Sequence, residues 1–268
     1  MITHGKRETI GPALARLESV ARGAGVELLL PGEEAAKHGL QEGDADLAAA
    51  DIAVVLGGDG TMLRALNRFI GQDVPVIGVN FGRVGFLASV TPDELEAGLA
   101  RVFAGDYRVV PLTTLELEVG DVRAVSVNDV VVLSATRGRM VALGWTIGGE
   151  DLGIQPCDGM ICSTPSGSTA YNLSNGGPVL VRGLDAMAVT FIAAHSLHAR
   201  PMVVPRGLDL DVRNETPDVA ASVLVDGHPA AEIGHGARAV VRLGDRRALL
   251  ATLPETTFFR RYRETFGS

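Results

Sequence analysis

The chain has 268 residues, of which 46% are hydrophobic and 21% charged, and its formal net charge at pH 7 is −8. This is the composition of a globular protein, long enough for one large domain or two small ones. The acidic balance excludes the broad basic surface of a nucleic-acid-binding protein and disfavours docking on anionic membranes. A polar N-terminal stretch, the lack of a membrane-spanning apolar run and only two cysteines, Cys157 and Cys162, favour a cytoplasmic protein.

The first hundred residues alternate between helical and strand patterns. Uniformly apolar runs that alternate with helices indicate a parallel sheet covered on both faces, so we predict a doubly wound α/β domain over residues 1–105. Before the first helical pattern only Met1 to Thr3 could form a strand, and they are too short, so we expect either a missing first strand or a different sheet edge. The predicted helices are 12–24, 61–70 and 91–104, and the predicted strands are 26–30, 52–56 and 74–79.

The pattern changes after residue 105. Leu115 to Val119 alternates apolar and polar residues, which is typical of an antiparallel strand with one wet face. Short strand candidates separated by Gly, Pro, Asn or Asp turns follow, and only 168–175 looks helical before residue 250. We therefore predict a β-rich, β-sandwich-like domain over residues 106–250. The further strand candidates are 125–133, 141–147, 160–163, 188–194, 208–212, 220–225 and 239–243, and a last helix is predicted over 255–266.

A glycine-rich segment, Gly57-Gly58-Asp59-Gly60-Thr61, follows an apolar strand and opens a helix. In open α/β sheets this position binds ligands, and glycines at a helix N-terminus let backbone N–H groups approach an anion. A carboxylate inside an anion-binding loop costs electrostatic energy, so Asp59 is a candidate to orient a hydroxyl, take its proton or hold Mg²⁺. The alternative is a glycine-rich turn in which Asp59 caps the helix.

A second segment, Thr164 to Pro178, contains many hydroxyl and amide side chains in a turn and a short helix. Such groups can bind ribose hydroxyls and phosphates without adding charge, and Tyr171 could stack on a base. The alternative is a capped helix that ends at Asn175-Gly176-Gly177. The alternative explains the glycines but not the density of hydroxyl groups.

Asn128 and Asp129 interrupt the apolar run 125–133. Polar side chains there need partners if they are buried, and ribose hydroxyls or a wet strand end would both serve. Other motifs carry no function by pattern: the chain has no Walker motif, His195 and His198 lack a third metal ligand, and the Cys pair lacks zinc partners.

Together these residues resemble the NAD kinase family from about Ala53 to the C-terminus. The resemblance rests on five segments, whose order and spacing make coincidence improbable. The first is shared with diacylglycerol and sphingoid lipid kinases, whereas 164–178 is far more specific to NAD kinases. The segments are Gly57 to Thr61, Val127 to Asp129, Thr164 to Pro178, His195 to Pro201 and Asp226 to His228.

The resemblance implies an enzyme that transfers the γ-phosphoryl group of ATP, with Mg²⁺ or another divalent cation, to the adenosine-ribose 2′-hydroxyl of NAD. Asp59 would be the catalytic carboxylate, and Asp158 would bind the nicotinamide end, often across a subunit interface of a homodimer or homotetramer. Many relatives have Glu in place of Asp129. Segment 251–268 would pack back on the first domain. The nucleotide- and phosphate-binding residues would be Gly57, Gly58, Gly60, Thr61 and Arg64, and the NAD-binding residues would be Asn128, Asp129, Arg139, Asp158, Thr169, Ala170, Tyr171, Asn172, Leu173, Ser174 and His228.

Two alternatives stay open at this point. A lipid kinase shares the glycine loop but has no use for 164–178, and a non-catalytic NADP-binding protein on the same scaffold would have no use for Asp59.

Overall fold

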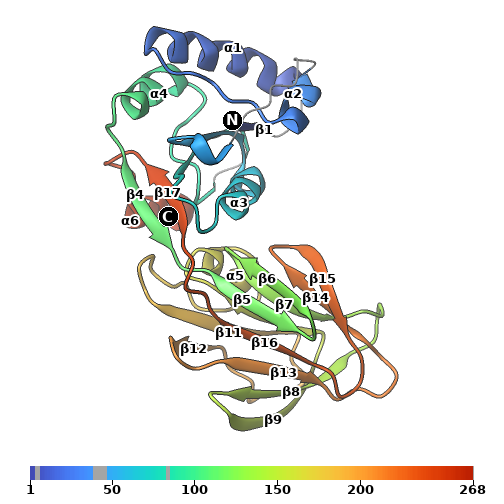
Figure 1. The fold of residues 1–268 in the computed structure, drawn as a ribbon. Helices are drawn as coiled ribbons and strands as arrows, with labels where there is room; N and C mark the ends of the chain where they lie inside the picture. Colours follow the sequence, from blue (N-terminus) through green and yellow to red (C-terminus); the bar gives the residue numbers. More distant parts are fainter. Residues whose placement is uncertain (4–6, 39–46, 83–84, 268) are drawn as a thin grey trace. The chain divides into compact units, whose positions relative to one another are not determined.

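The fold is described from a computed structural model that covers residues 1–3, 7–38, 47–82 and 85–267 (Figure 1). The chain forms two compact units. Unit 1 combines Met1–Pro111 with Ala248–Ser268, and unit 2 is Leu112–Arg247. The chain therefore enters unit 2 once, leaves it once, and returns to unit 1.

Unit 1 is built on a five-stranded sheet with the order β1-β2-β3-β17-β4, in which β1, β2, β3 and β17 run parallel. This confirms the predicted parallel α/β domain. Its strands are β1 (Ile2–Thr3), β2 (Ala53–Gly57), β3 (Val76–Asn80), β4 (Arg108–Leu112) and β17 (Ala248–Thr252), and its helices are α1 (Arg7–Gly23), α2 (Gly32–His38), the 3₁₀ turn η1 (Leu47–Ala49), α3 (Asp59–Arg68), α4 (Leu95–Phe103) and α6 (Phe258–Phe266).

Helices cover both faces of this sheet because alternate residues of each strand point to opposite sides. Ile77 and Val79 of β3 belong to a core cluster with buried residues of α1 and α4. Gly78, between them, faces α3: a Cβ built on it would lie 2.4 Å from the Met62 sulfur. Figure 1 shows α1 beside α4 in this unit.

The edge of the sheet differs from an ordinary doubly wound domain. Ile2 and Thr3 form a two-residue strand that pairs with Val55 and Leu56. Residues 26–30, predicted as a strand, are extended but join no ladder. Two residues of β1 offer too few backbone groups to pair with a further strand, which accounts for this difference.

Unit 2 is a sandwich of two six-stranded antiparallel sheets, which confirms the β-rich, sandwich-like prediction. The orders are β12-β11-β10-β7-β14-β15 and β6-β5-β16-β13-β8-β9. Inward-facing Val, Leu, Met and Trp145 side chains fill the space between the sheets. The elements are β5 (Leu115–Val119), β6 (Val122–Ser126), β7 (Asp129–Ser134), β8 (Val141–Ile147), β9 (Glu150–Cys157), β10 (Gly159–Ser163), η2 (Gly167–Thr169), α5 (Tyr171–Ser174), β11 (Ala186–Ile192), β12 (Met202–Pro205), β13 (Leu210–Asn214), β14 (Ala221–Val225), β15 (His228–Ile233) and β16 (Arg238–Leu243).

The units divide at 111/112 and 247/248, whereas the sequence places the divisions near 105 and 250. The difference arises because β4 and β17 lie next to each other in the sheet of unit 1. Residues 106–111, which lie inside the predicted β-rich range 106–250, therefore belong to the first unit.

Candidate active site

The glycine-rich loop lies where the sequence predicts it, at the carboxyl end of β2 and the start of α3. Asp59 is the first residue of α3, and its carboxylate does not cap that helix. Its Oδ2 accepts a hydrogen bond from the backbone N–H of Phe86 at 2.8 Å, and its Oδ1 accepts one from Leu87 at 3.3 Å. The helix-cap alternative is therefore wrong, and the carboxylate is oriented by a second loop.

The segment from Gly85 to Leu87 is a part of the site that sequence reasoning missed. A Cβ on Gly85 would lie 2.2 Å from Asp59 Oδ1, so only glycine lets this backbone reach the carboxylate. The glycines after the third apolar run were the available signal, but nothing local connects them with Asp59.

The other loop residues have distinct roles. Gly58 passes close to Gly82, because a Cβ on Gly82 would lie 3.1 Å from the Gly58 Cα. Gly60 is exposed and faces open space, which leaves room for a ligand against the first turn of α3. Thr61 is buried, and a Cβ on Gly57 would lie 2.6 Å from its Oγ1.

Arg64 points away from the loop toward β1 and α2. Its guanidinium donates to the Thr3 carbonyl at 2.8 Å and lies 3.5 Å from the buried carboxylate of Glu34. The structure therefore does not bring Arg64 together with the glycine loop, although the side chain is half exposed.

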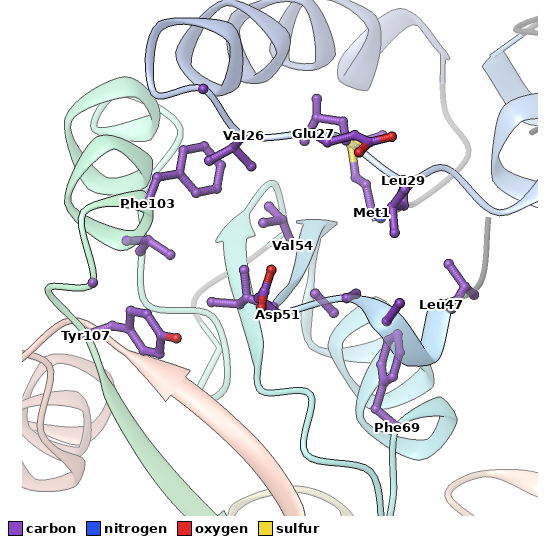
Figure 2. A pocket seen from close by; sticks show the side chains of 18 residues that line it. Met1, Val26, Glu27, Leu29, Leu47, Asp51, Val54, Phe69, Phe103 and Tyr107 are labelled. Carbon is purple, nitrogen blue, oxygen red and sulfur yellow. Dashed lines mark hydrogen bonds between the residues drawn. The ribbon is translucent and has the colours of Figure 1, made fainter.

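A cavity of about 480 Å³ lies at the opposite, amino end of β2 (Figure 2). Its wall includes Met1, Val26, Leu29, Val54 and Phe103. Most of these side chains are apolar, and the Met1 amino group is already bonded to the Leu29 carbonyl at 2.7 Å. This cavity is consequently not part of the phosphate site around Asp59.

In unit 2, Asp226 organises the predicted sugar-binding residues. Asp226 and Gly227 form a tight turn between β14 and β15 with positive φ angles of 48° and 79°. The Asp226 carboxylate accepts backbone N–H groups of Val127, Asn128 and Asp129 at 2.9, 2.7 and 3.1 Å. It also accepts the Ser126 hydroxyl at 2.7 Å.

This carboxylate explains why one predicted strand is two. The apolar run 125–133 was predicted as continuous, but β6 ends at Ser126 and β7 begins at Asp129. The intervening N–H groups bond to Asp226 instead of a neighbouring strand. In the sequence Asp226 belongs to the segment Asp226 to His228, and no local pattern connects it with Asn128.

Segment 164–178, which is rich in hydroxyl groups, packs against Val127 and Asn128, the two residues between β6 and β7. The Thr164 N–H donates to the Asn128 carbonyl at 2.8 Å, and the Thr164 hydroxyl donates to the Val127 carbonyl at 2.6 Å. A Cβ on Gly167 would lie 2.2 Å from the Asn128 carbonyl oxygen. Two polar atoms here are buried without a hydrogen-bond partner, Asn128 Oδ1 and Ser166 Oγ. A buried acceptor left unpaired costs about 1–3 kcal/mol, so these atoms fit a place that a ligand completes.

The helical part of the segment divides its residues between structure and surface. Asn172 is fully buried, and its amide bonds to the Ser168 and Pro178 carbonyls and to the Thr190 hydroxyl. It therefore holds the segment together and has no exposed surface for a ligand. Thr169 and Leu173 are partly buried, whereas Ala170, Tyr171 and Ser174 are exposed.

Asp158 and Arg139 lie at the other end of the same strands. β7 and β10 pair antiparallel, with Ser163 opposite Asp129 and Gly159 opposite Leu133. At about 3.3 Å per residue the five residues of β10 span roughly 16 Å. Asp158, exposed before β10, is thus separated from Asn128 by the length of the strand.

Arg139 is exposed and pairs with Asp218 at 3.1 Å, so it shares this distant end. His228 is exposed on the Asp226 side, where its Nδ1 lies 3.0 Å from the Asp226 carbonyl oxygen. The structure therefore brings Asn128, Asp129 and His228 together around Asp226 and leaves Asp158 and Arg139 outside this group.

Burial and charge act together on Asp129, whose side chain is 6% exposed. Desolvation, followed by the nearby negative charge of Asp226, raises the pKa of Asp129 from 3.8 to about 7. Between about pH 4 and 7 the folded state therefore holds a proton that the unfolded chain has already released. Stability falls as pH rises through this window, and the full penalty is present above pH 7.

We expect Asp129→Asn to remove this pH dependence. The wild-type free energy of unfolding should decline by roughly 2–4 kcal/mol more than that of the variant between pH 5 and pH 8. Trp145, the one tryptophan of the chain, lies in the core of unit 2, so its fluorescence during urea unfolding reports on this unit. Asp121→Asn, at an exposed turn, is the control. Parallel pH profiles of wild type and Asp129→Asn would contradict the expectation.

No three His, Cys, Asp or Glu side chains of the described residues form a metal-binding group. Within the same part of the chain, no helix combines the length and apolar character needed to cross a membrane. Cys157 and Cys162 are both buried and free.

Comparison with known families gives two matches that together cover most of the chain. Residues 40–107 match the ATP-NAD kinase N-terminal domain, and residues 127–253 match the ATP-NAD kinase C-terminal domain. The first range includes Asp59, and the second includes the Asn128 turn and Asp226.

Individual proteins show the same likeness. The chain is 36% identical to the NAD kinase of Gemmatimonas aurantiaca, over 81% of this chain and 77% of that protein. It is 33% identical to the NAD kinase of Syntrophotalea carbinolica, over 92% of this chain and 90% of that protein.

Two solved structures share the fold. An Archaeoglobus fulgidus NAD kinase in complex with ATP gives a TM-score of 0.75 at 25% identity, covering 95% of this chain and 93% of that one. Yeast NADH kinase complexed with NADH gives a TM-score of 0.73 at 26% identity, and the match covers 65% of the length of that chain. With this fold, these site residues and these matches, the chain belongs to the NAD kinase family.

Proposed function

We propose that the chain transfers the γ-phosphoryl group of ATP to the 2′-hydroxyl of the adenosine ribose of NAD, giving NADP. The observation that carries this proposal is the Asp59 carboxylate, which two backbone N–H groups fix at the end of β2 beside the exposed Gly60. The family membership supports the same reaction and does not favour a lipid kinase.

In unit 1, Asp59 orients the attacking hydroxyl and takes its proton. Each carboxylate oxygen has two lone-pair directions, so the bonds to Phe86 and Leu87 leave acceptor capacity for a hydroxyl. The N–H groups of Asp59 and Gly60 precede the first hydrogen bonds of α3, which begin with Thr61 donating to the Gly58 carbonyl at 2.9 Å, and the helix dipole favours phosphate there. Gly57, Gly58, Gly60 and Thr61 form this anion-binding part.

In unit 2, the turn around Asn128 reads the adenosine half of NAD. The unpaired Asn128 Oδ1 accepts a ribose hydroxyl, and Asp129 lies beside it. Tyr171, which is 41% exposed, supplies a surface for the base, and Thr169, Ala170, Ser174 and His228 complete the contacts. Asn172 and Leu173 support this segment from inside.

A divalent cation, Mg²⁺ or Mn²⁺, fits this donor set. Mg²⁺ is commonly held by substrate phosphates with one or two carboxylates, and Asp59 is the one acidic side chain of the loop 57–61. When bound with ATP, the cation would neutralise charge on the phosphoryl oxygens.

We infer that the enzyme is a homo-oligomer with a shared NAD site. Asp158 and Asn128 lie at opposite ends of β10, so Asp158 of one copy is suited to NAD held by the Asn128 turn of another. Light scattering at micromolar concentration should give a dimer or tetramer, and a fully active monomer would contradict both the assembly and the shared site.

The deciding experiment measures NADP formation from NAD and ATP with the purified chain. We expect turnover that requires both substrates and disappears in excess EDTA, and a raised KM for NAD in Asn128→Ala. Diacylglycerol and sphingosine, supplied in place of NAD, should give no product. Phosphorylation of either lipid without NADP formation would overturn the proposal.

A further inference from the structure

The C-terminal helix α6 lies against the segment that orients Asp59. Phe86, whose N–H donates to the Asp59 carboxylate, is 9% exposed. Its ring centroid lies 5.5 Å from that of Phe266 and 6.1 Å from that of Phe258, both on α6. Aromatic pairs at such distances contribute about 0.5–1.5 kcal/mol beyond their buried area. The backbone N–H that donates to the Asp59 carboxylate therefore belongs to a residue whose side chain packs against α6.

A second contact from α6 reaches the same segment two residues later. The Arg261 guanidinium donates a hydrogen bond from Nη2 to the Ala88 carbonyl. Its side chain is only 13% exposed, whereas that of its neighbour Arg260 is 51% exposed and pairs with Glu264. Phe86 and Ala88 are thus both tied to α6, on either side of Leu87, the other donor to Asp59.

The remaining anchor of the segment lies on the sheet. The N–H groups of Ser89 and Val90 both donate to the Gly78 carbonyl of β3, at 3.2 and 3.1 Å. β3 thus fixes the end of the segment, and α6 fixes the part that touches the carboxylate.

α6 adds little to the hydrophobic core, because none of its residues is fully buried. Phe259 and Tyr262 remain 67% and 42% exposed. The helix begins with Thr257 as its cap, whose hydroxyl accepts the Arg260 N–H at 3.1 Å. A well-capped helix that buries so little of itself, yet contacts the segment beside Asp59 twice, is placed to hold that segment.

We propose that α6 is a positioning element for phosphoryl transfer, in which Arg261, Phe258 and Phe266 hold segment 86–88 so that its N–H groups fix the Asp59 carboxylate. The inference rests on the proposed role of Asp59. A displacement of about 1 Å at a reacting group can lower the rate roughly 10²-fold. α6 residues should therefore affect kcat without contacting substrate.

The test compares variants on the two sides of α6. Arg261→Met keeps the length of the side chain but loses its hydrogen-bond donors. Phe266→Leu replaces the aromatic ring with a smaller apolar side chain. Because Phe266 is 41% exposed, we expect this variant to fold. We expect kcat to fall about 10- to 100-fold in Arg261→Met and several-fold in Phe266→Leu, with KM for NAD within twofold of wild type. Arg261→Lys, which can still donate to Ala88, should recover most of kcat. Arg260→Met, on the same helix, should behave as wild type.

The same substitution in an Asp59→Asn enzyme separates a positioning effect on Asp59 from a general loss of activity. In Asp59→Asn the group to be positioned is gone, so adding Arg261→Met should lower the residual kcat by less than twofold. An equal fold-loss in both backgrounds, or a wild-type kcat in folded Arg261→Met and Phe266→Leu, would overturn the inference. If Asp59→Asn alone keeps more than about a third of the wild-type rate, the proposed role of Asp59 fails instead.

Discussion

Asp59→Asn should lower kcat by a factor on the order of 10²–10⁴, which is the usual cost of losing a general base. The amide has nearly the shape of the carboxylate but cannot take a proton from the ribose hydroxyl. It also places an N–H group toward the N–H of Phe86 or Leu87, which weakens the orientation of the side chain. NAD affinity, measured by isothermal titration, should stay within a few-fold of wild type because the proposed sugar contacts lie in unit 2.

The matched control is Asp73→Asn, an exposed carboxylate of the same unit outside the glycine loop. It should keep wild-type kcat, and both variants should show the wild-type circular dichroism spectrum. A folded Asp59→Asn enzyme with more than about a third of wild-type turnover would rule out the general-base assignment.

Asp226→Ala should destabilise unit 2 by on the order of 3–5 kcal/mol and abolish measurable NAD binding. The carboxylate accepts three backbone N–H groups and one hydroxyl, and hydrogen bonds to charged groups contribute about 1.5–3 kcal/mol each. Removing it leaves the three backbone N–H groups without this acceptor and releases the turn that presents Asn128. Relief of the repulsion on Asp129 offsets part of this loss.

Two controls separate the carboxylate from the backbone conformation. Asp226→Gly keeps the positive φ of 48° without strain but loses the acceptor, so it should be almost as unstable as Asp226→Ala. Asp245→Ala removes a carboxylate that is 99% exposed and paired with Arg206, so it should cost at most about 1 kcal/mol. Urea unfolding followed by Trp145 fluorescence decides, and a loss below about 1 kcal/mol in both Asp226 variants would refute the role of this carboxylate.

The sequence predicts the elements whose signals are local. An apolar run, three glycines and a helical pattern are enough to place Asp59 at the end of β2, because all three features lie within residues 52–70. The same holds for the alternation of helices with buried strands in unit 1 and for most of the short strands of unit 2. The exceptions are β9, β12 and β15, which are not among the predicted strands.

Contacts between distant residues leave no such local signal. The Asp59 carboxylate accepts hydrogen bonds from Phe86 and Leu87, which are 27 and 28 residues further along the chain. The Asp226 carboxylate accepts one from Val127 at a separation of 99 residues. A run of apolar residues such as 125–133 favours one strand, and only the folded neighbour shows that it is broken. Asn172 shows the same kind of limit on prediction. The sequence shows that its side chain is polar, but it does not show that this side chain points into the protein.

The position of β17 has a consequence for the order in which the chain folds during synthesis. β17 lies between β3 and β4 in the sheet of unit 1, yet it is made after the whole of unit 2. While the ribosome is still adding residues 112–247, β4 has no neighbour in its sheet and α6 does not yet exist. The residues of unit 2 are therefore complete, and free to fold, before the sheet that carries the catalytic loop can close.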